Sequence, residues 1–453
     1  MINIAVVGSG SVFSPELIIG FAQNADKIGP ITLRFIDTDK PRQKVVSGFC
    51  RRLLKDGEWP LRVHKRIGSY DKPDSLNAFM DAPGPLPKNQ PNHVEIIDCD
   101  DLGDCLNGVD FVLLQIRHGG LLARIEDERL GKKYKLPFTE TISVCGFSTF
   151  LRTYYEYEKL GAAIKKYAPD AWVLNFTNPS AQLSETLSMM GIKKVVGICN
   201  GFMGTKDTIQ ELLGIEDGTY FMNWRGLNHL TVVDGIYHEG RNRMTELLEK
   251  LPEDYYSEFD KKMLVCLGSL LNGYFQYYFN REKVINKLQS QPRLRSETVK
   301  EIDALLLKEY KTAKTIPDSL AKRGGYGYAT AVVNIVRAMC MNEGSIHYAI
   351  VPNGVCLPSL PQDAFVEVPV YVSKNGVLPI ATTDLPDYAK GLAISLKSYE
   401  RILMKAAKER DKRGMLEAMM THPLLNCFTI AEPLLEDCLD INRSYLPDNL
   451  HTG

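Results

Sequence analysis

The stretch 171–200 constrains the fold of this chain most strongly, because it contains two strand-like segments separated by a helix-like segment over 180–190. The first strand leads into Asn178, and the second delivers Cys199 and Asn200 at its carboxyl end. Crossovers between parallel strands are right-handed, so both polar tips are expected at the same edge of a parallel sheet. Ligands bind at that edge in open α/β sheets, and the sequence therefore predicts a binding site there.

The chain begins with a related pattern, in which the strand-like run 2–7 leads through a glycine turn into the helix-like segment 17–23. Glycines in such a turn let backbone N–H groups approach a pyrophosphate at the helix N-terminus. Phe13 stands where the usual fingerprint has its third glycine. We expect a dinucleotide at the turn residues Gly8, Gly10, Ser11, Val12 and Phe13.

The next strand-like segment, 31–36, ends in Asp37, which favours NAD as the dinucleotide. A carboxylate at this place accepts hydrogen bonds from the adenosine ribose hydroxyls. Two alternatives stay open. Asp37 could be a strand-end residue that caps a turn, or Arg42 nearby could accommodate the extra phosphate of NADP.

The composition argues against several classes of partner. The chain has 453 residues, with 54 lysines and arginines against 55 aspartates and glutamates, so its formal net charge is −1. This balance favours neither nucleic acid nor an anionic membrane. We find no apolar run of membrane-spanning length and no signal-peptide pattern. Ten cysteines without CxxC spacing suit a reducing compartment, so we expect a cytoplasmic protein.

A third buried strand, 110–116, carries Gln115 near its carboxyl end, and the charged segment 121–129 follows it. We interpret most charges of that segment as a solvated helix face, with a minority, Asp127 among them, lining the site. The proline-rich segment 82–91 predicts an exposed loop or insertion.

Beyond about residue 200, longer helical patterns predict an α-rich part that one β-rich island at 346–371 interrupts. The helical segments are 208–213, 256–280, 296–315, 328–341 and 388–410. The predicted class is α/β. We expect a Rossmann-like, doubly wound parallel sheet over 1–200, followed by an α+β domain over 201–453 that completes the site.

Several polar residues could carry chemistry. A thiolate and an imidazole can share one divalent ion, so Cys199 and His229 are candidate metal ligands, although a core cysteine and a hydrogen-bonded histidine are the alternative. Tyr328 follows a glycine pair at a helix start, where the helix dipole and nearby cations could lower a phenol pKa, unless it is an aromatic packing residue. Asn178 could orient a sugar hydroxyl or cap the following helix.

Several blocks of sequence together resemble glycoside hydrolase family four, the NAD- and divalent-metal-dependent glycosidases. They follow the family order between residue 4 and about residue 380. The blocks include Gly8-Ser-Gly-Ser, Gln115-Ile-Arg-His-Gly-Gly, Asn175-Phe-Thr-Asn-Pro, Gly197-Ile-Cys-Asn, Gly226-Leu-Asn-His, Lys322-Arg-Gly-Gly with Tyr328, and Leu360-Pro-Gln-Asp-Ala-Phe-Val-Glu-Val-Pro. NAD-dependent glycosidases are an exception to the two-carboxylate scheme of glycoside hydrolysis.

The resemblance implies a fold similar to lactate and malate dehydrogenases and an elimination assisted by NAD. NAD⁺ would take hydride from sugar C3, and a divalent ion, usually Mn²⁺, held by Cys199 and His229 would polarise the C3 oxygen. Tyr328 would remove the C2 proton, the aglycone would leave, water would add, and the hydride would return. The implied cofactor set adds Asp37, Arg42 and Gln115 to the turn residues, and the substrate set is Asn178, Asn200 and Arg124. By analogy, we expect a homodimer or homotetramer.

Departures from the family pattern bear on the substrate. Asn200 stands where α-glucosidases of phosphorylated sugars have aspartate, and asparagine is more usual in 6-phospho-β-glucosidases. The segment 201–206 instead resembles the branch that acts on unphosphorylated galactosides and uronides. The segment 342–347 lacks the arginine of phosphosugar enzymes, which leaves Arg124 and Lys206 as weaker phosphate ligands. We therefore expect an unphosphorylated glycoside (galactoside, glucoside or uronide), with a 6-phospho-β-glucoside as the alternative.

Two other classes of protein fit the same sequence features. One is an NAD-dependent 2-hydroxy-acid dehydrogenase, which consumes NAD stoichiometrically and needs no metal. The other is a catalytically idle NAD-binding sensor. Neither class requires the pair of Cys199 and His229.

Overall fold

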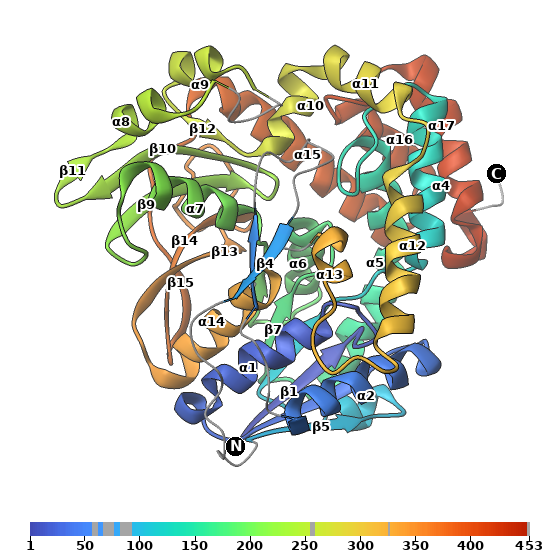
Figure 1. The fold of residues 1–453 in the computed structure, drawn as a ribbon. Coiled ribbons are helices and arrows are strands. Elements are labelled where there is room, and N and C mark those ends of the chain that lie inside the picture. Colours follow the sequence, from blue (N-terminus) through green and yellow to red (C-terminus); the bar gives the residue numbers. More distant parts are fainter. Residues whose placement is uncertain (57–61, 67–76, 82–92, 254–258, 325–326, 451–453) are drawn as a thin grey trace.

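The computed structural model describes the chain except for residues 57–61, 67–76, 82–92, 254–258, 325–326 and 451–453 (Figure 1). The predicted proline-rich loop at 82–91 lies outside the described residues. All ten cysteines are unpaired thiols, and most of them are buried. In the described part of the chain, none of the helices has the length and apolar character needed to cross a membrane.

Six parallel strands form the first half of the sheet, in the order β8-β7-β6-β1-β2-β5. Their apolar runs are buried, as expected for strands with helices on both faces. The prediction of a Rossmann-like parallel sheet is therefore confirmed. The strands are β1 (Ile2–Val7), β2 (Ile31–Ile36), β5 (Val94–Asp98), β6 (Phe111–Leu114), β7 (Trp172–Asn175) and β8 (Val195–Gly197).

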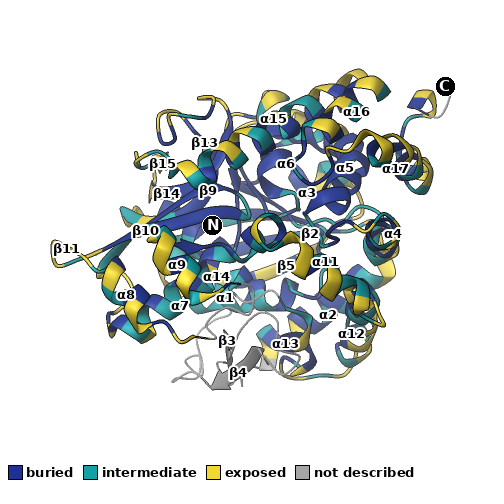
Figure 2. Cartoon of the chain, turned by 90° about the horizontal axis from the view of Figure 1, so that it is seen from above, coloured by how far each residue is buried: buried dark blue, intermediate teal, exposed yellow. Residues whose placement is uncertain are grey.

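Helices cover both faces of this parallel region, and Figure 2 shows the buried strands between them. The helix α1 (Ser14–Ile28) packs against α2 (Lys40–Asp56) and α14 (Tyr328–Met341) on one face. The other face carries α3 (Leu102–Leu106), α5 (Ser143–Tyr167), α6 (Ser180–Met189) and α15 (Asp387–Glu409). Since α14 and α15 belong to the second half of the chain, both halves share one core.

The sheet continues into an antiparallel region, because β13 pairs with β8 through Ile350 and Gly197. Thirteen strands of the described chain thus form one mixed sheet. The predicted division at residue 200 falls inside this sheet and stays a prediction. The added strands are β9 (Tyr220–Leu227), β10 (Leu230–His238), β11 (Arg241–Asn242), β12 (Leu270–Leu271), β13 (Ser345–Pro352), β14 (Phe365–Ser373) and β15 (Gly376–Pro379).

The β9–β10 hairpin was not predicted, and the expectation of a single β-rich island is wrong. Both strands are buried along most of their length, so they lack the polar and apolar alternation that marks a strand in sequence. A register shift between Val233 and Ile236 further disturbs that alternation. The predicted island itself is confirmed as β13 and β14.

The predicted helix over 256–280 is wrong where the structure describes it. The helix α9 (Lys261–Leu267) ends at Gly268, which has a left-handed φ of 62°. Two short strand residues follow, and Asn272 then caps η1 (Gly273–Phe275) by accepting a hydrogen bond from the Tyr274 N–H. A glycine stop and an asparagine cap interrupt the apolar period, so no continuous helix forms.

The remaining helices lie mostly around the edges of the sheet (Figure 1). The predicted helices at 328–341 and 388–410 are confirmed as α14 and α15. The other described elements are β3 (Arg62–Arg66), β4 (Asn77–Asp81), α4 (Gly120–Lys133), α7 (Gly201–Leu213), α8 (Met244–Lys250), α10 (Gln276–Phe279), α11 (Arg281–Ser290), α12 (Arg295–Glu309), α13 (Ser319–Arg323), α16 (Lys412–Thr421), α17 (Phe428–Ile441), η2 (Arg443–Tyr445) and η3 (Asp448–Leu450).

The charged helix α4 corrects a further interpretation, because several of its charges are buried and not solvated. Asp127 is fully buried and forms two hydrogen bonds to the guanidinium of Arg152, at 2.9 and 2.7 Å. Glu128 pairs with Arg124 at 2.9 Å and accepts two hydrogen bonds from Ser296. These charges therefore fasten α4 to α5 and α12.

Candidate active site

The glycine turn after β1 is shaped for close backbone contacts. Gly8 has a φ of +89°, and a side chain there would lie 2.8 Å from the carbonyl oxygen of Gln115. The N–H of Gly10 donates to a carboxylate oxygen of Asp37 at 2.9 Å. The first N–H groups of α1 already donate to carbonyl oxygens of the turn itself, so they are engaged in this structure. The left-handed φ of Gly8 fits the tight turn predicted for a dinucleotide.

Asp37 and Arg42 are both engaged in protein contacts beside this turn. Asp37 accepts from the backbone N–H groups of Gly10 and Asp39, which is the turn-capping role kept as an alternative. The guanidinium of Arg42 donates two hydrogen bonds to the carboxylate of Asp303, a bidentate pair with distances of 2.6 and 3.0 Å. Its guanidinium is therefore committed to α12, which weakens the NADP alternative.

Gln115 and Tyr328 meet at the carboxyl end of β6. The Tyr328 hydroxyl donates a hydrogen bond to Gln115 Oε1, while Gln115 Nε2 donates to the Gly8 carbonyl at 3.1 Å. The Tyr328 ring packs against Phe176, with 4.1 Å between ring centroids, and against Phe13 at 5.7 Å. The phenol is thus fixed in position between the glycine turn and the loop after β7.

Burial raises the pKa of the Tyr328 phenol well above its ordinary value, and the nearby Glu16 carboxyl adds to the effect. This direction is opposite to the lowering that the helix dipole was expected to produce. Desolvation of a phenolate outweighs the dipole because the ring is almost completely buried.

The loop that carries Asn178 is held by the buried side chain of Asn175. Its Oδ1 accepts from the Tyr157 hydroxyl at 2.7 Å, and its Nδ2 donates to Ser184 Oγ at 3.0 Å. The helix α6 begins after Pro179 and has no side-chain cap. Asn178 therefore does not cap the helix, which leaves the predicted role in sugar binding.

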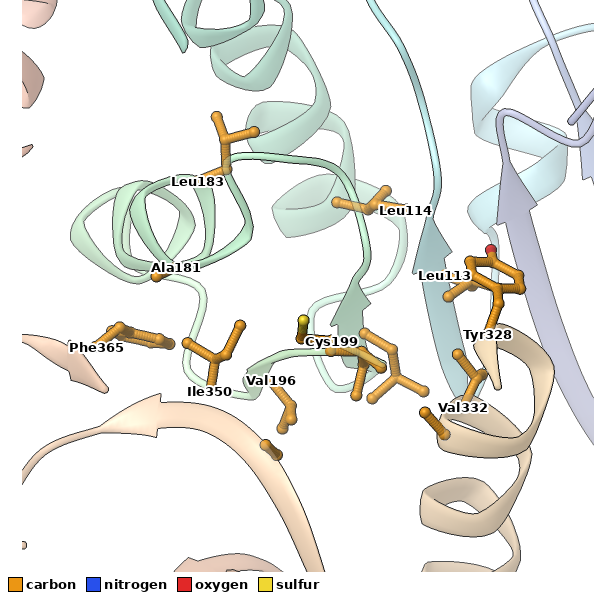
Figure 3. Packing of buried hydrophobic residues seen from close by; sticks show 14 of the residues in the cluster. Leu113, Leu114, Ala181, Leu183, Val196, Cys199, Tyr328, Val332, Ile350 and Phe365 are labelled. Carbon is orange, nitrogen blue, oxygen red and sulfur yellow. The ribbon is translucent and has the colours of Figure 1, made fainter. Parts of the chain in front are cut away.

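Cys199 lies just after β8 and is buried. Figure 3 shows its sulfur and the hydroxyl of Tyr328 pointing towards the same side of the sheet. The Gly201 N–H donates to the sulfur at 3.3 Å. Burial raises the pKa of the thiol to about 12, although the Gly201 N–H and the amide of Asn228 oppose the shift. Asn200, the next residue, occupies the N-cap position of α7.

Asn228 and His229 form the two-residue turn between β9 and β10. His229 has a φ of 65°, a left-handed conformation that few residues other than glycine and asparagine adopt. Its ring stacks on Tyr274 at 4.2 Å, and its Nδ1 lies 2.7 Å from the Thr141 hydroxyl. Burial lowers the pKa of the imidazole to about 4, so the ring is neutral at pH 7.

Cys199 and His229 can supply some of the ligands of a metal ion. Thr141 occupies Nδ1 of His229, which leaves Nε2 free to act as a ligand, as the neutral ring requires. Asn228 precedes His229 in the chain, and its amide acts on the pKa of the Cys199 thiol, so one residue relates the two candidate ligands. Among the residues that the structure describes, no three His, Cys, Asp or Glu side chains gather to hold a metal.

A cluster of arginines lies beside this site, and Glu140 is at its centre. Arg117 and Arg124 both pair with the Glu140 carboxylate. Although burial alone would raise it, these guanidinium groups hold the pKa of Glu140 well below its ordinary value. The members of this arginine cluster are Arg117, Arg124, Arg295 and Arg323.

Arg323 is the least satisfied member of the arginine cluster. Its side chain is only 12% exposed, its Nε has no hydrogen-bond partner, and its guanidinium lies 5.3 Å from the ring centroid of Phe13. Burial, followed by repulsion from Arg117, lowers the pKa of Arg323 to about 10. A crowded group of cations of this kind favours an anionic ligand.

A small cavity borders the site. It has a volume of about 50 Å³ and is lined by Thr141, Asn228 and His229 on one side and by Tyr399 and His422 on the other. This space suits one or two water molecules. A larger cavity, about 250 Å³ between α5, α6 and α15, touches none of the predicted site residues.

The structure brings the predicted residues into two adjoining groups. Gly8, Gly10, Gln115 and Tyr328 form one group, and Cys199 and His229 form the other with Asn228. Sequence reasoning missed the partners Arg117, Glu140, Thr141, Asn228, Arg323 and Glu367. Each lies within or next to a block quoted for the family resemblance, but its residue type alone indicated no chemistry.

The fold and the site define an enzyme on a dinucleotide-binding scaffold, with its reactive groups at the carboxyl edge of the parallel strands. Comparisons with known proteins agree with this class. The model of the "Family 4 glycosyl hydrolase" matches residues 70–215, and that of the "Family 4 glycosyl hydrolase C-terminal domain" matches residues 224–425.

Similar proteins match the chain over nearly its whole length. It is 28% identical to "6-phospho-beta-glucosidase BglT" of Thermotoga maritima, and the match covers 98% of this chain and 99% of that protein. It is also 28% identical to a "Probable 6-phospho-beta-glucosidase" of Bacillus subtilis, over 98% and 97% of the two chains. A solved 6-phospho-beta glucosidase from Thermotoga maritima, with manganese, NAD+ and glucose-6-phosphate, superposes with a TM-score of 0.85, 28% identity and coverage of 98% and 99%.

The chain therefore belongs to family 4 of the glycosyl hydrolases and is a glycoside hydrolase. This confirms the resemblance found in the sequence. It also favours a glycosidase over the dehydrogenase and sensor alternatives.

Proposed function

We propose that this chain is an NAD- and divalent-metal-dependent glycosidase that acts on 6-phospho-β-glucosides. The observation that carries the proposal is the hydrogen bond from Tyr328 to Gln115. It places a fixed phenol on the sheet edge that also carries the glycine turn and Cys199. The similarity to the Thermotoga maritima enzyme with manganese, NAD+ and glucose-6-phosphate supports the cofactors and the phosphorylated sugar.

The residues of the chain divide the chemical work between them. When bound, NAD⁺ supplies a reversible hydride acceptor for sugar C3, and the divalent ion supplies a Lewis acid for the oxygen on that carbon. Cys199 and His229 hold the ion, and Asn178 orients a sugar hydroxyl. Tyr328 accepts the proton of C2, while Gln115 keeps its oxygen in place.

Tyr328 can serve as a base only if the ligands change its surroundings. In the protein alone, burial keeps the phenol protonated at neutral pH. A bound divalent cation would favour the phenolate by charge attraction, whereas NAD⁺ is needed earlier, because oxidation at C3 is what makes the C2 proton acidic. The proposal therefore predicts that proton removal at C2 depends on both cofactors being present.

Asn200 makes acid catalysis at the leaving group weak. An amide cannot donate a proton usefully, so protonation of the aglycone oxygen falls to water or to another group. The small cavity beside His229 has room for one or two waters. Glycosides with good leaving groups are therefore the preferred test substrates.

The arginine cluster supports a phosphorylated substrate more strongly than the sequence did. Segment 342–347 lacks the expected arginine, and Lys206 is paired with Asp217 at 2.5 Å. The arginine cluster, by contrast, places three guanidinium groups around Glu140, and Arg323 Nε makes no hydrogen bond and lies 3.9 Å from the Asp303 carboxylate. A phosphate dianion matches such an arrangement. The unphosphorylated glycoside favoured by the sequence becomes the competing outcome.

The direct experiment compares nitrophenyl 6-phospho-β-glucoside with plain nitrophenyl β-glucoside, galactoside and galacturonide, in the presence of NAD⁺ and Mn²⁺. We expect cleavage of the phosphorylated compound without net NADH formation, and solvent deuterium at C2 of the product. Faster cleavage of a plain glycoside would overturn the proposed substrate. Steady NADH formation from a 2-hydroxy acid would overturn the glycosidase mechanism itself.

A variant of the arginine cluster tests the origin of phosphate selectivity. Arg323→Gln should raise KM for the phosphorylated substrate by about 10- to 100-fold, because one charge-assisted contact is lost. Arg51→Gln, an exposed arginine paired with Asp98, is the matched control and should leave KM unchanged.

We also propose a homodimer or homotetramer, which light scattering on the purified protein would measure.

A further inference from the structure

Glu367 on β14 is a buried carboxylate close to the proposed metal ligands. It is 1% exposed, and both of its oxygens accept hydrogen bonds from neighbouring side chains. Trp224 Nε1 donates to Oε1 at 2.9 Å, and Asn228 Nδ2 donates to Oε2 at 2.8 Å. The backbone of Glu367 also pairs with Gly226, so the carboxylate is fixed relative to the β9–β10 turn.

No basic side chain compensates this carboxylate. Within the part of the chain that the structure describes, the ion pairs of Lys and Arg do not include Glu367. A buried carboxylate without a counter-charge costs free energy, and two neutral hydrogen-bond donors offset only part of that cost. The nearest place for a cation is the site between Cys199 and His229.

Asn228 connects Glu367 to that site. Its amide nitrogen donates to the carboxylate at 2.8 Å, and Asn228 precedes His229 in the two-residue turn after β9. The amide cannot flip without turning its oxygen towards the carboxylate and losing this bond. Glu367 thus fixes the Asn228 side chain at the turn that carries His229.

We propose that Glu367 is a positioning residue for the divalent ion, which it serves by orienting Asn228 beside His229 and by adding a second negative charge to the site. The thiolate and the carboxylate together balance the two positive charges of the ion. This inference rests on the proposed metal dependence of the enzyme. Partners of metal ligands commonly change metal affinity by 10- to 100-fold when they are replaced.

The test measures metal binding without turnover, with Co²⁺ as the probe and its charge-transfer absorption as the sign of a bond to the Cys199 thiolate. Glu367→Gln should weaken Co²⁺ and Mn²⁺ binding by about 10- to 100-fold. Trp224→Phe is the matched control, because it removes the other hydrogen bond to the same carboxylate and leaves Asn228 in place. Its metal affinity should stay within about threefold of the unaltered protein.

A structural role alone would lower the unfolding temperature of both variants and leave both metal affinities unchanged, and that result would overturn the inference. If Glu367→Gln does not fold, the Asn228→Ala variant replaces it in the test. We expect the same loss of Co²⁺ and Mn²⁺ affinity in that variant. Absence of the Co²⁺ band in the unaltered protein would overturn the inference and the proposed metal dependence together. Unchanged Co²⁺ affinity in Glu367→Gln, with normal glycosidase activity in the unaltered protein, would overturn the inference alone.

Discussion

Each reactive side chain of the proposed site is held by a second side chain from a distant part of the sequence. Tyr328 bonds to Gln115, and His229 bonds to Thr141. Fixed partners of this kind keep reacting groups within the narrow range of geometry that catalysis requires. The contribution of one residue is therefore best measured with its partner left intact.

Tyr328→Phe keeps the ring packing against Phe176 and removes only the hydroxyl. We expect kcat to fall by about 10²- to 10⁴-fold, the usual contribution of a general base, with little change in Mn²⁺ affinity. Deuterium exchange at C2 should disappear together with turnover. Tyr154→Phe, which borders the distant cavity, is the control and should retain full exchange. Normal exchange in Tyr328→Phe would assign the base to another group.

Glu140→Gln tests the electrostatics of the arginine cluster. The folded pKa of Glu140 lies well below the ordinary value of 4.5, so its charge stabilises the fold above that pH. We expect the free energy of unfolding to fall by about 1.5–3 kcal/mol at pH 7. The difference should shrink as the pH is lowered from 5 to 3, because the carboxyl of the unfolded chain becomes protonated near its ordinary pKa while the folded carboxyl stays charged.

Urea unfolding at a series of pH values measures this difference. Glu126→Gln breaks an exposed pair with Arg129 and should cost less than about 1 kcal/mol, without a pH trend. An equal, pH-independent loss in both variants would mean that the arginine cluster does not stabilise the Glu140 charge.

At the residue scale, the sequence could predict groups whose chemistry is evident from their type. Cys199, His229 and Tyr328 are of this kind. Asn228 and Glu367 could not be predicted, since their importance depends on a hydrogen bond between residues 139 positions apart. Burial reverses expectations as well, because it raises the pKa of Tyr328 where the helix dipole alone would lower it.

Among the elements, the β9–β10 hairpin contributes most to the site and was not found in the sequence. Its two-residue turn presents Asn228 and His229 side by side. The parallel strands could be predicted because each short apolar run precedes a glycine turn or a polar tip. The hairpin strands bury polar side chains such as Asn223 and Arg225 together with apolar ones and carry Gly226 and Gly235, so they were not recognised as strands in the sequence.

Gly226→Ala should destabilise the hairpin and the metal site together. A Cβ at this position would lie 2.2 Å from the Leu230 carbonyl oxygen, at a φ of +152°. We expect a loss of at least about 2 kcal/mol in unfolding free energy, together with weaker Co²⁺ binding. Gly273→Ala has open space around its Cβ and should change neither quantity. Unchanged Co²⁺ affinity in Gly226→Ala would show that the turn geometry does not depend on this glycine.

At the scale of the whole molecule, one continuous sheet crosses the predicted domain boundary at residue 200. Contacts across that position include the strand pair β8 and β13 and the bond from Arg42 to Asp303. Lys397 on α15 also pairs with Glu185 on α6 at 3.0 Å, and both side chains are 2% exposed. The order of elements could be predicted, but these pairings could not, because they join residues far apart in sequence.

We therefore expect one cooperative unfolding transition, with β7 and β14 opening at the same urea concentration in hydrogen-exchange measurements. Lys397→Met removes the nearer of two cations from the buried carboxylate of Glu185, since Arg401 stays 3.9 Å away, and should cost about 3 kcal/mol. Because the two parts share one core, the variant should shift the midpoints of β7 and β14 by the same amount. Lys390→Met, on the exposed side of α15, should shift neither. A shift confined to one strand would mean that the two parts unfold separately, as a boundary at residue 200 implies.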